Sequence, residues 1–491
     1  MAQVSVIKEI TGKLAQIVGA DRVTDEYAAC WAVMQGLSAE HPPISHLIVP
    51  PDIVVRPKTT EQVSQIVKLA NLYKIPIVPA GGKGHPTGGA IPAHGGILLD
   101  TLDMNQIIRI DEDSMIITVQ AGCFWDSMRS VLAERGLRLG GFGPHGPSGA
   151  VGGGIATGTL PNDFMKYNFV PAEVEALEVV LPQGDVIWTG ARNNVNADFA
   201  IRYCNGPDLA GLFCGSHGCL GVITTASVKI YRMPKWTIRE SYVFNKYENG
   251  LKALRDFQLT HYSSDCICLC GKHTISAFAP TAPPDTEILI PIILEEEVDE
   301  RILKIKKEVF DNIAKKHNGK IQGEADAWFA YNRFKQNYLP GDSLGGPMEI
   351  TGLKPTLYSA RDGDRLHGIA EKLQENFVLP FKDVDVPEEM KKWRGWFHTV
   401  HASPHPNCVD DVLFMYFDDT DFVHGEKMLE LAHKVGNEES GRGYASYWIG
   451  HAKSKGVSSN FSKEYFNFLM LLKQKMDPNN IMNPGMFNLD Y

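Results

Sequence analysis

The stretch 79–90, PAGGKGHPTGGA, is unusual in its composition, because it places five glycines and two prolines in twelve positions. It follows the strand-like run 75–78, IPIV, and precedes a second strand-like run at 96–100, GILLD. Glycine loses more backbone freedom on folding than any other residue. So dense a cluster therefore predicts that something approaches this backbone too closely to leave room for side chains.

The composition limits the class of protein. The chain has 491 residues, enough for two or three domains, and a formal charge of −10, which argues against a nucleic-acid binder. No run approaches eighteen apolar residues and the start lacks the pattern of a signal peptide, so the chain is not expected to span a membrane. Nine cysteines, an odd number, favour reduced thiols and a cytoplasmic location.

The segments around the cluster alternate between strand and helix patterns. Residues 52–58 predict a strand, and 59–74 predict a helix whose Thr59 and Gln62 fit a capping box. Further strands are expected at 106–111 and 114–122, and a helix at 123–136 that ends at a glycine. The glycine cluster thus lies directly after the second strand of a β-α-β unit.

Two more glycine-rich stretches follow, GGFGPHGPSGAVGGGIATG at 140–158 and FCGSHGCLG at 213–221. The segment between them, 172–190, predicts a hairpin that turns at Gln183-Gly184. Three side-chain-poor loops between strands favour a large ligand whose phosphates are bound by backbone amides, although any one loop alone is more typical of a tight turn. The P-loop pattern is missing, and the loop at 80–90 leads into a strand instead of a helix, which argues against a Rossmann nicotinamide domain.

The pattern changes near 232–236, where longer helical segments such as 299–317 replace the glycine clusters. In DCICLC, Cys266, Cys268 and Cys270 alternate as on a buried strand and lack the spacing of iron–sulfur ligands. We therefore expect a domain boundary there, and a C-terminal helix that ends in the turn DPNNIMNPG.

The order of the segments from RPKTTEQVSQIVKLAN through PAGGKGHPTGG, GAVGGGIATG and DLAGLFCGSHGCLGVIT resembles the FAD-binding domain of the vanillyl-alcohol oxidase / p-cresol methylhydroxylase (PCMH-type) flavoprotein superfamily. That superfamily includes glycolate, D-lactate and D-2-hydroxyglutarate dehydrogenases. The resemblance implies an α+β fold: an FAD-binding domain of two α/β subdomains at 1–235, completed by 456–491. A substrate or cap domain with an antiparallel sheet would span 236–455.

The resemblance also implies which residues bind FAD, which we expect to be held non-covalently. These are Pro79, Ala80, Gly81, Gly82, Lys83, Gly84, His85, Pro86, Thr87, Pro147, Ser148, Gly149, Gly152, Gly153, Gly154, Ala156, Thr157, Gly158, Gly221, Val222, Ile223 and Asn483. The loop 80–90 would surround the pyrophosphate, and 148–158 would approach the diphosphate and the isoalloxazine. Lys83 either pairs with a phosphate or is a solvated loop lysine.

The cap region departs from both substrate branches of the superfamily. The metal-binding H-x-G-D-G-N-x-H and E-H-G motifs of the hydroxy-acid dehydrogenases are missing, so no metal is predicted. The phenol-oxidising branch fits the order of the segments better, yet Thr87 stands where a tyrosine is expected and Trp448 where an arginine is expected. The substrate class stays open between a 2-hydroxy acid, another alcohol and a 4-alkylphenol.

Hydride transfer to a flavin needs a base near the substrate C–H, a role that suits the pKa of histidine. FHTVHASPH supplies His398, His401 and His405, and the spacing of three puts the first two on opposite faces of a strand. We favour His401 as the catalytic residue, with His405 and His398 as alternatives and Arg442 as a candidate for binding an anionic group.

The function predicted from the sequence is an FAD-dependent dehydrogenase or oxidase that acts on a small molecule. With no iron–sulfur or haem motif in the chain, the electrons would pass to a partner subunit, a quinone or another external acceptor. A homo- or hetero-oligomer is expected on general grounds. The alternative is an electron-relay subunit that holds FAD and has no small-molecule substrate of its own.

Overall fold

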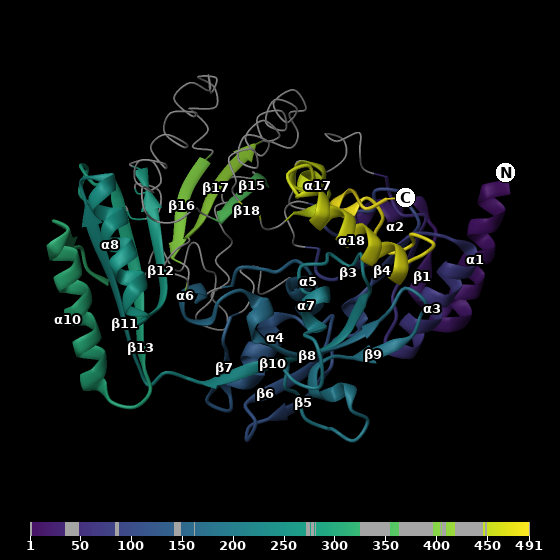
Figure 1. Ribbon diagram of the computed structural model, residues 1–491, viewed down its shortest axis with the longest axis horizontal. Coiled ribbons are helices and arrows are strands. Elements are labelled where there is room, and N and C mark those ends of the chain that lie inside the picture. The colour runs from purple at the N-terminus through teal and green to yellow at the C-terminus, as the bar shows by residue number, and fades with distance from the viewer. Residues whose placement is uncertain are drawn as a thin grey trace.

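The computed structural model describes most of the chain. The described residues are 2–34, 49–83, 88–141, 149–161, 163–271, 275, 279, 281–324, 354–362, 396–402, 404, 409–417, 445–446 and 449–490. Figure 1 shows three sheets arranged from the N-terminal end of the molecule towards helices α8 and α10 at the opposite end.

The first sheet contains the β-α-β unit that the sequence predicts. Its four strands lie in the order β1 (Val23–Thr24), β2 (Ile53–Val55), β4 (Ile97–Asp100) and β3 (Ile77–Ala80). Strands β2, β4 and β3 are parallel. Helix α3 (Thr60–Tyr73) joins β2 to β3, and the hydroxyl of Thr59 caps it by accepting from the amide of Gln62 at 3.2 Å. Because β3 ends at Ala80, the glycine cluster begins at the carboxyl edge of this sheet.

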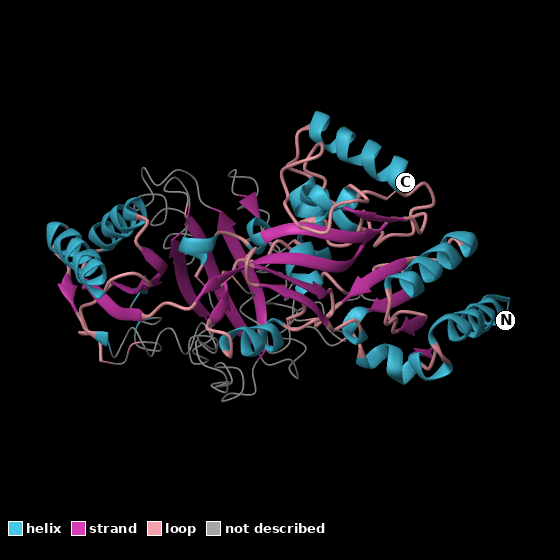
Figure 2. Cartoon of the chain, turned by 90° about the horizontal axis from the view of Figure 1, so that it is seen from below, coloured by secondary structure: helices cyan, strands magenta, loops and turns pink. Residues whose placement is uncertain are grey.

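Helix α1 (Ala2–Val18) precedes this sheet in the chain, and α2 (Tyr27–Ala32) lies between β1 and β2. The apolar side chains of α1 and α3 share a buried cluster with those of β2, β3 and β4. In Figures 1 and 2, α1 and the C-terminal segment lie at the same end of the molecule.

The second sheet is antiparallel and completes the first region. Its strands lie in the order β5 (Ile107–Asp111), β6 (Ile116–Gln120), β10 (Val222–Arg232), β8 (Val174–Val180) and β9 (Val186–Trp188), and β7 (Leu137–Leu139) also pairs with β10. The β8–β9 hairpin turns at Gly184, whose φ of +88° explains the glycine there. Helix α4 (Trp125–Ala133) follows β6, as predicted.

Short helices cross between the sheets, and one of them corrects the sequence analysis. Part of the stretch predicted as a loop at 148–158 is helix α5 (Val151–Ala156). The amide of Gly152 donates to the carbonyl of Ala121 at 2.8 Å, so α5 packs directly on the end of β6. Its glycines therefore permit close packing of a helix, where the sequence suggested an irregular loop. The other short helices here are α6 (Phe164–Tyr167) and α7 (Ala210–Phe213).

The third sheet is antiparallel throughout, as predicted for the cap. Its order is β14 (Lys320–Ile321), β11 (Trp236–Phe244), β13 (Ile288–Glu296), β12 (Ser263–Cys270), β16 (Trp396–Ala402), β17 (Val409–Phe417), β15 (Lys354–Asp362) and β18 (Ala445–Ser446). Helices α8 (Tyr247–Thr260) and α10 (Glu300–Lys316) pack on one face, in a core that includes Cys266, Cys268 and Cys270. The alternating cysteines are thus part of a buried strand, as the sequence predicts.

The opposite face of the third sheet contacts the first region through buried charges. On β12 and β13, Asp265 and Glu295 belong to this face, since their neighbours in sequence pack towards α8 and α10. Asp265 accepts from the amide of Asp163 at 3.4 Å, and Glu295 pairs with Arg138 at 2.6 Å and with Lys166 at 3.3 Å. Arg138 also pairs with Asp163. We call Arg138, Asp163, Lys166, Asp265 and Glu295 the interdomain charge cluster.

After the third sheet the chain returns to the first two. Helices α17 (Gly450–Ser458) and α18 (Lys463–Met476) lie beside the first two sheets (yellow in Figure 1). Met482 forms a parallel bridge with Ile77 of β3, and so the C-terminal segment reaches the strand that leads into the glycine cluster.

The interdomain charge cluster generates a prediction about stability. Replacing Arg138 with methionine leaves Asp163 and Glu295, which are 0% and 4% exposed, without this cation. Breaking a buried pair in this way costs about 3–5 kcal/mol, and we expect that loss in the free energy of unfolding measured by urea denaturation. Arg135→Met is the matched control, because Arg135 is half exposed and its pair with Glu112 lies at the surface. A loss for Arg138→Met no larger than that of the control would contradict this role of the cluster.

Candidate functional site

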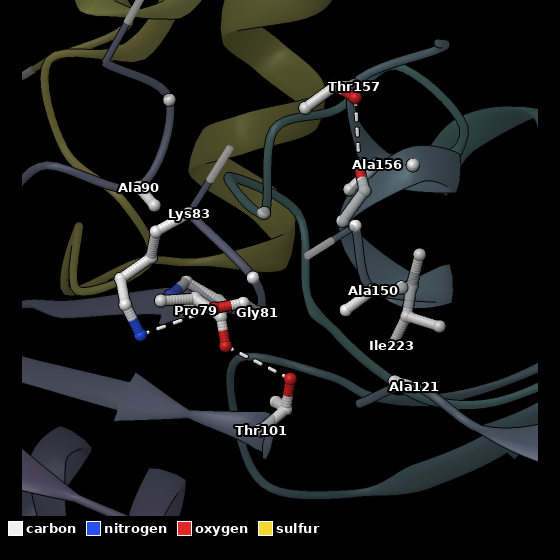
Figure 3. Close-up of a pocket in the computed structure, with 18 of the residues that line it drawn as sticks. Pro79, Gly81, Lys83, Ala90, Thr101, Ala121, Ala150, Ala156, Thr157 and Ile223 are labelled. Carbon is white, nitrogen blue, oxygen red and sulfur yellow. Dashed lines mark hydrogen bonds between the residues drawn. The ribbon is translucent and has the colours of Figure 1, made fainter. Parts of the chain in front are cut away.

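A cavity opens where the glycine-rich segments meet, between the end of β3, the start of α5 and the turn before β10. Its void measures about 970 Å³, a volume that includes the open space at the mouth. The lining residues are Pro79, Ala80, Gly81, Gly82, Lys83, Gly89, Ala90, Thr101, Ala121, Trp125, Gly149, Ala150, Gly152, Gly153, Gly154, Ala156, Thr157, Thr159, His217, Gly218, Gly221 and Ile223. Figure 3 shows that segments far apart in the sequence supply its walls.

Several glycines are required because the walls of the cavity contact one another. A Cβ atom on Gly81 would lie 2.9 Å from the Cβ of Ala150. One on Gly152 would lie 2.7 Å from the Cβ of Ala121, and one on Gly218 would lie 3.0 Å from the Cγ of Pro79. The close approach predicted from the glycine cluster is therefore partly an approach of protein to protein. These contacts hold the backbone of three segments around one space.

Other groups of the wall face the space itself. A Cβ atom added to Gly153 meets no other atom within 4 Å, so this position opens onto the cavity. Within the part of the chain that the structure describes, the amides of Gly81 and Gly82 donate no hydrogen bond. Two adjacent free N–H groups beside a glycine that leaves room fit the phosphates of a dinucleotide such as FAD.

Lys83 lies at the edge of the cavity and is held by an ion pair. Its Nζ lies 2.8 Å from Oδ2 of Asp100 and donates to the carbonyl of Gly81 at 3.3 Å, as Figure 3 shows for the second contact. Its φ of +54° is in the left-handed region. Asp100, 4% exposed, also accepts from the amide of Leu102. The sequence allowed two roles for Lys83, contact with a phosphate or a solvated loop lysine. The structure shows instead that Lys83 pairs with a buried carboxylate.

Threonine hydroxyls supply the polar part of the lining. Thr101 donates to the carbonyl of Ala80 at 3.0 Å and so ties β3 to the end of β4. Thr157 donates to the carbonyl of Gly153 at 2.9 Å and lies 2.9 Å from the hydroxyl of Thr159. These bonds orient the wall, and each hydroxyl oxygen can still accept from a ligand.

His217 is a lining residue that the sequence analysis did not select. It is 5% exposed, and its φ of +51° is uncommon for a residue with a side chain. Its amide donates to the carbonyl of Ala156 at 2.9 Å, and its ring packs edge-on against Phe487 at 5.7 Å. Its position inside FCGSHGCLG was the signal available, since the flanking glycines indicate a tight turn around it.

Most of the cofactor residues expected from the sequence line this one cavity. They are Pro79, Ala80, Gly81, Gly82, Lys83, Gly149, Gly152, Gly153, Gly154, Ala156, Thr157, Gly221 and Ile223. Gly158, Val222 and Asn483 lie next to lining segments but do not line it. The remaining ones, Gly84, His85, Pro86, Thr87, Pro147 and Ser148, lie outside the described residues.

The catalytic candidates belong to the third sheet. In the pairing of β16 with β12, position 398 is opposite Cys270 and position 401 is opposite Ile267. Directly paired positions belong to the same face of a sheet. Position 398 therefore belongs to the face of Cys270, which packs with α8 and α10, and position 401 to the face of Asp265, which contacts the first region. His405 and Arg442 lie outside the described residues.

Comparisons with known proteins agree with this geometry. The family model described as "FAD binding domain" matches residues 51–190, which include the first two glycine clusters. The glycolate oxidase subunit GlcD of Bacillus subtilis is 26% identical over 98% of this chain and 97% of its own length. The mitochondrial D-lactate dehydrogenase [cytochrome] of Arabidopsis thaliana is 28% identical over 89% of this chain and 73% of its own length.

A solved structure shows the same fold. The crystal structure of p-cresol methylhydroxylase with substrate bound superposes with a TM-score of 0.82 at 17% identity, covering 98% of this chain and 97% of that one. The α+β architecture expected from the sequence is thereby confirmed. Among the helices that the structure describes, none has both the length and the apolar character that crossing a bilayer requires.

Gly153 offers a test of the cavity as the FAD site. In Gly153→Leu the new side chain extends into open space, and leucine favours the helix over glycine by about 0.5–1 kcal/mol. We therefore expect a folded protein whose Kd for FAD, measured by titrating apoprotein and following flavin fluorescence, rises at least about tenfold. Gly12→Leu on α1 is the control, since a Cβ there also meets no atom within 4 Å. Equal FAD affinity in both variants would place the cofactor elsewhere.

Family and cofactor follow from the cavity, the family model and the shared fold taken together. A cavity lined by backbone amides and small residues fits an FAD site, and the matching family model is described by that cofactor. The chain contains an FAD-binding domain, shares its overall fold with p-cresol methylhydroxylase, and has FAD as its cofactor.

Proposed function

We propose that this protein is an FAD-dependent dehydrogenase that oxidises a small 2-hydroxy acid. The observation that carries the proposal is the alignment with glycolate oxidase subunit GlcD over nearly the full length of both chains. The D-lactate dehydrogenase of Arabidopsis thaliana supports the same substrate class. The likeness to p-cresol methylhydroxylase supports the fold alone, so a 4-alkylphenol ranks second.

In this proposal the cofactor lies between the first two sheets, where the cavity is, and the third sheet binds the substrate. Bound FAD supplies a hydride acceptor at its N5 atom. The chain supplies a space bounded by peptide groups, with Lys83 already neutralised by Asp100. Burial raises the pKa of the nearby Cys123 and Cys219 thiols to about 11, which keeps both protonated at neutral pH and favours non-covalent attachment of the flavin.

The base in this proposal is His401. The register of β16 assigns position 401 to the face of the third sheet that contacts the first region, and position 398 to the face that packs with α8 and α10. A neutral histidine near the substrate would take the proton of the substrate hydroxyl, while the hydride leaves the carbon that bears this hydroxyl. His405 and Arg442 remain further candidates, Arg442 for the carboxylate of the acid.

The electrons would then pass to a separate acceptor, either a partner subunit or a quinone. The second candidate function, an electron-relay subunit without its own small-molecule substrate, is retained because the hydroxy-acid metal motifs are missing from the sequence. For the isolated protein, the relay function predicts that no small-molecule substrate reduces the flavin.

The test is anaerobic reduction of the purified flavoprotein. D-lactate or glycolate is expected to bleach the visible absorbance of the flavin, whereas 4-ethylphenol leaves it unchanged. Bleaching by the phenol alone would replace the 2-hydroxy acid with the second substrate class. If dithionite reduces the flavin of the yellow protein and none of these compounds does, the result would favour the relay function.

The role of His401 is tested with the same assay. His401→Gln is expected to slow flavin reduction by about 10²–10⁴-fold, the usual contribution of a general base, with FAD content unchanged. In the wild type the rate should rise with pH through the range where histidine loses its proton, near 6.5, and this dependence should vanish in the variant. His398→Gln is the matched control on the opposite face of the strand. Equal rates in both variants would exclude His401 as the base.

A further inference from the structure

The C-terminal helix α18 carries a buried ammonium group that the proposed chemistry does not use. Lys473 is 1% exposed, and its Nζ donates to three acceptors. They are the carbonyl of Cys219 at 3.1 Å, Oδ2 of Asp477 at 2.5 Å and the carbonyl of Met482 at 2.7 Å. An ammonium has three N–H donors, so this arrangement satisfies all of them.

Asp477 extends the arrangement into the turn that follows α18. It is fully buried, and its carboxylate also accepts from the amides of Ile481 at 3.0 Å and Met482 at 2.8 Å. The charge of Lys473 is therefore balanced inside the protein. The pair fixes the backbone of 477–482 as well as the end of the helix.

The segment 477–483 contacts two of the chain segments that form walls of the FAD cavity. Ile481 accepts from the amide of Ile77 at 2.6 Å, and Asn483 donates from its amide to the carbonyl of Ile77 at 2.8 Å, which ties the segment to β3. The side-chain amide of Asn483 donates to the carbonyl of His217 at 2.6 Å. β3 leads into Gly81 and Gly82, and His217 is itself a lining residue.

Lys473 itself contacts the wall formed by the turn 217–219. Its bond to the carbonyl of Cys219 falls on the residue that follows Gly218, which lines the cavity against Pro79. The turn 217–219 is thus held at both ends, by Asn483 at His217 and by Lys473 at Cys219. Two segments separated by about 140 residues in the sequence are held in place by one buried ion pair.

We infer that Lys473 is a positioning residue for FAD: its buried ammonium, through Asp477, Met482 and Cys219, sets the spacing between the Gly81–Gly82 wall and the His217–Gly218 wall. It does not touch the cofactor. The inference rests on FAD as the cofactor and is independent of the substrate class. It explains why a fully buried lysine occurs on a helix that is otherwise largely exposed.

Lys473→Met tests the inference with a side chain of similar length. The change removes the ammonium that donates to Asp477 and to the carbonyls of Cys219 and Met482, so the 217–219 turn should relax. We expect the Kd for FAD, from flavin fluorescence on titration of the apoprotein, to rise at least about tenfold. The visible circular dichroism of the flavin at saturating FAD should change as well. Lys475→Met, on an exposed position of the same helix, should alter neither quantity.

The visible circular dichroism separates positioning from a general effect on folding. It is measured below the melting temperature of each apoprotein, where loss of stability alone leaves the flavin environment unchanged. A Lys473→Met protein with wild-type Kd and wild-type visible circular dichroism would overturn the inference, whatever its melting temperature. FAD binding by the wild type is the reference, and its absence would instead refute the cofactor assignment.

If Lys473→Met does not fold, Asn483→Gly tests whether the C-terminal segment positions the walls of the FAD cavity. Glycine tolerates the φ of +40° found at this position, keeps the backbone bond to Ile77 and removes the side-chain bond to His217. A raised Kd for FAD with an unchanged apoprotein melting temperature would support positioning by the C-terminal segment. A wild-type Kd would overturn it.

Discussion

Close contact between chain segments at glycine positions brings the walls of the FAD cavity together. At Gly81 and Gly152 the opposing wall comes so close that a methyl group would not fit without a shift, and at Gly218 it would be in tight contact with Pro79. Peptide N–H groups can face a common space only when the segments that carry them approach to this distance. The fold therefore surrounds the phosphates of FAD with peptide dipoles and needs no large number of cationic side chains.

The sequence predicted much of the first region because its elements are local. Thr59 and Gln62 specify the start of α3, and Gly184 specifies the β8–β9 turn through its positive φ. The glycine clusters identified the cavity for the same reason, since each is a continuous stretch. The helix α5 was missed because a glycine-rich hexapeptide has low helix propensity, and it is packing on Ala121 and Trp125 that stabilises it.

What the sequence did not predict depends on contacts between distant residues. The partner of Lys83 is Asp100, and the partner of Arg138 is Glu295, and neither pairing follows from spacing. His217 lay in a recognised glycine-rich stretch, but its exposure to the cavity depends on Asn483 and Phe487 near the other end of the chain. The spacing of His398 and His401 predicted that they lie on opposite faces of a strand, but not which of them lies on which face. The register of β16 with β12 provides that assignment.

The position of Lys473 and Asn483 in the chain has a consequence for biosynthesis. Ribosomes make the glycine-rich walls first, and α18 with the turn after it leaves the exit tunnel hundreds of residues later. Until then the strand β3 lacks its neighbour Met482 and the turn 217–219 lacks both of its anchors. A chain that stops before α18 lacks these contacts, and we expect it to bind FAD more weakly than the full chain.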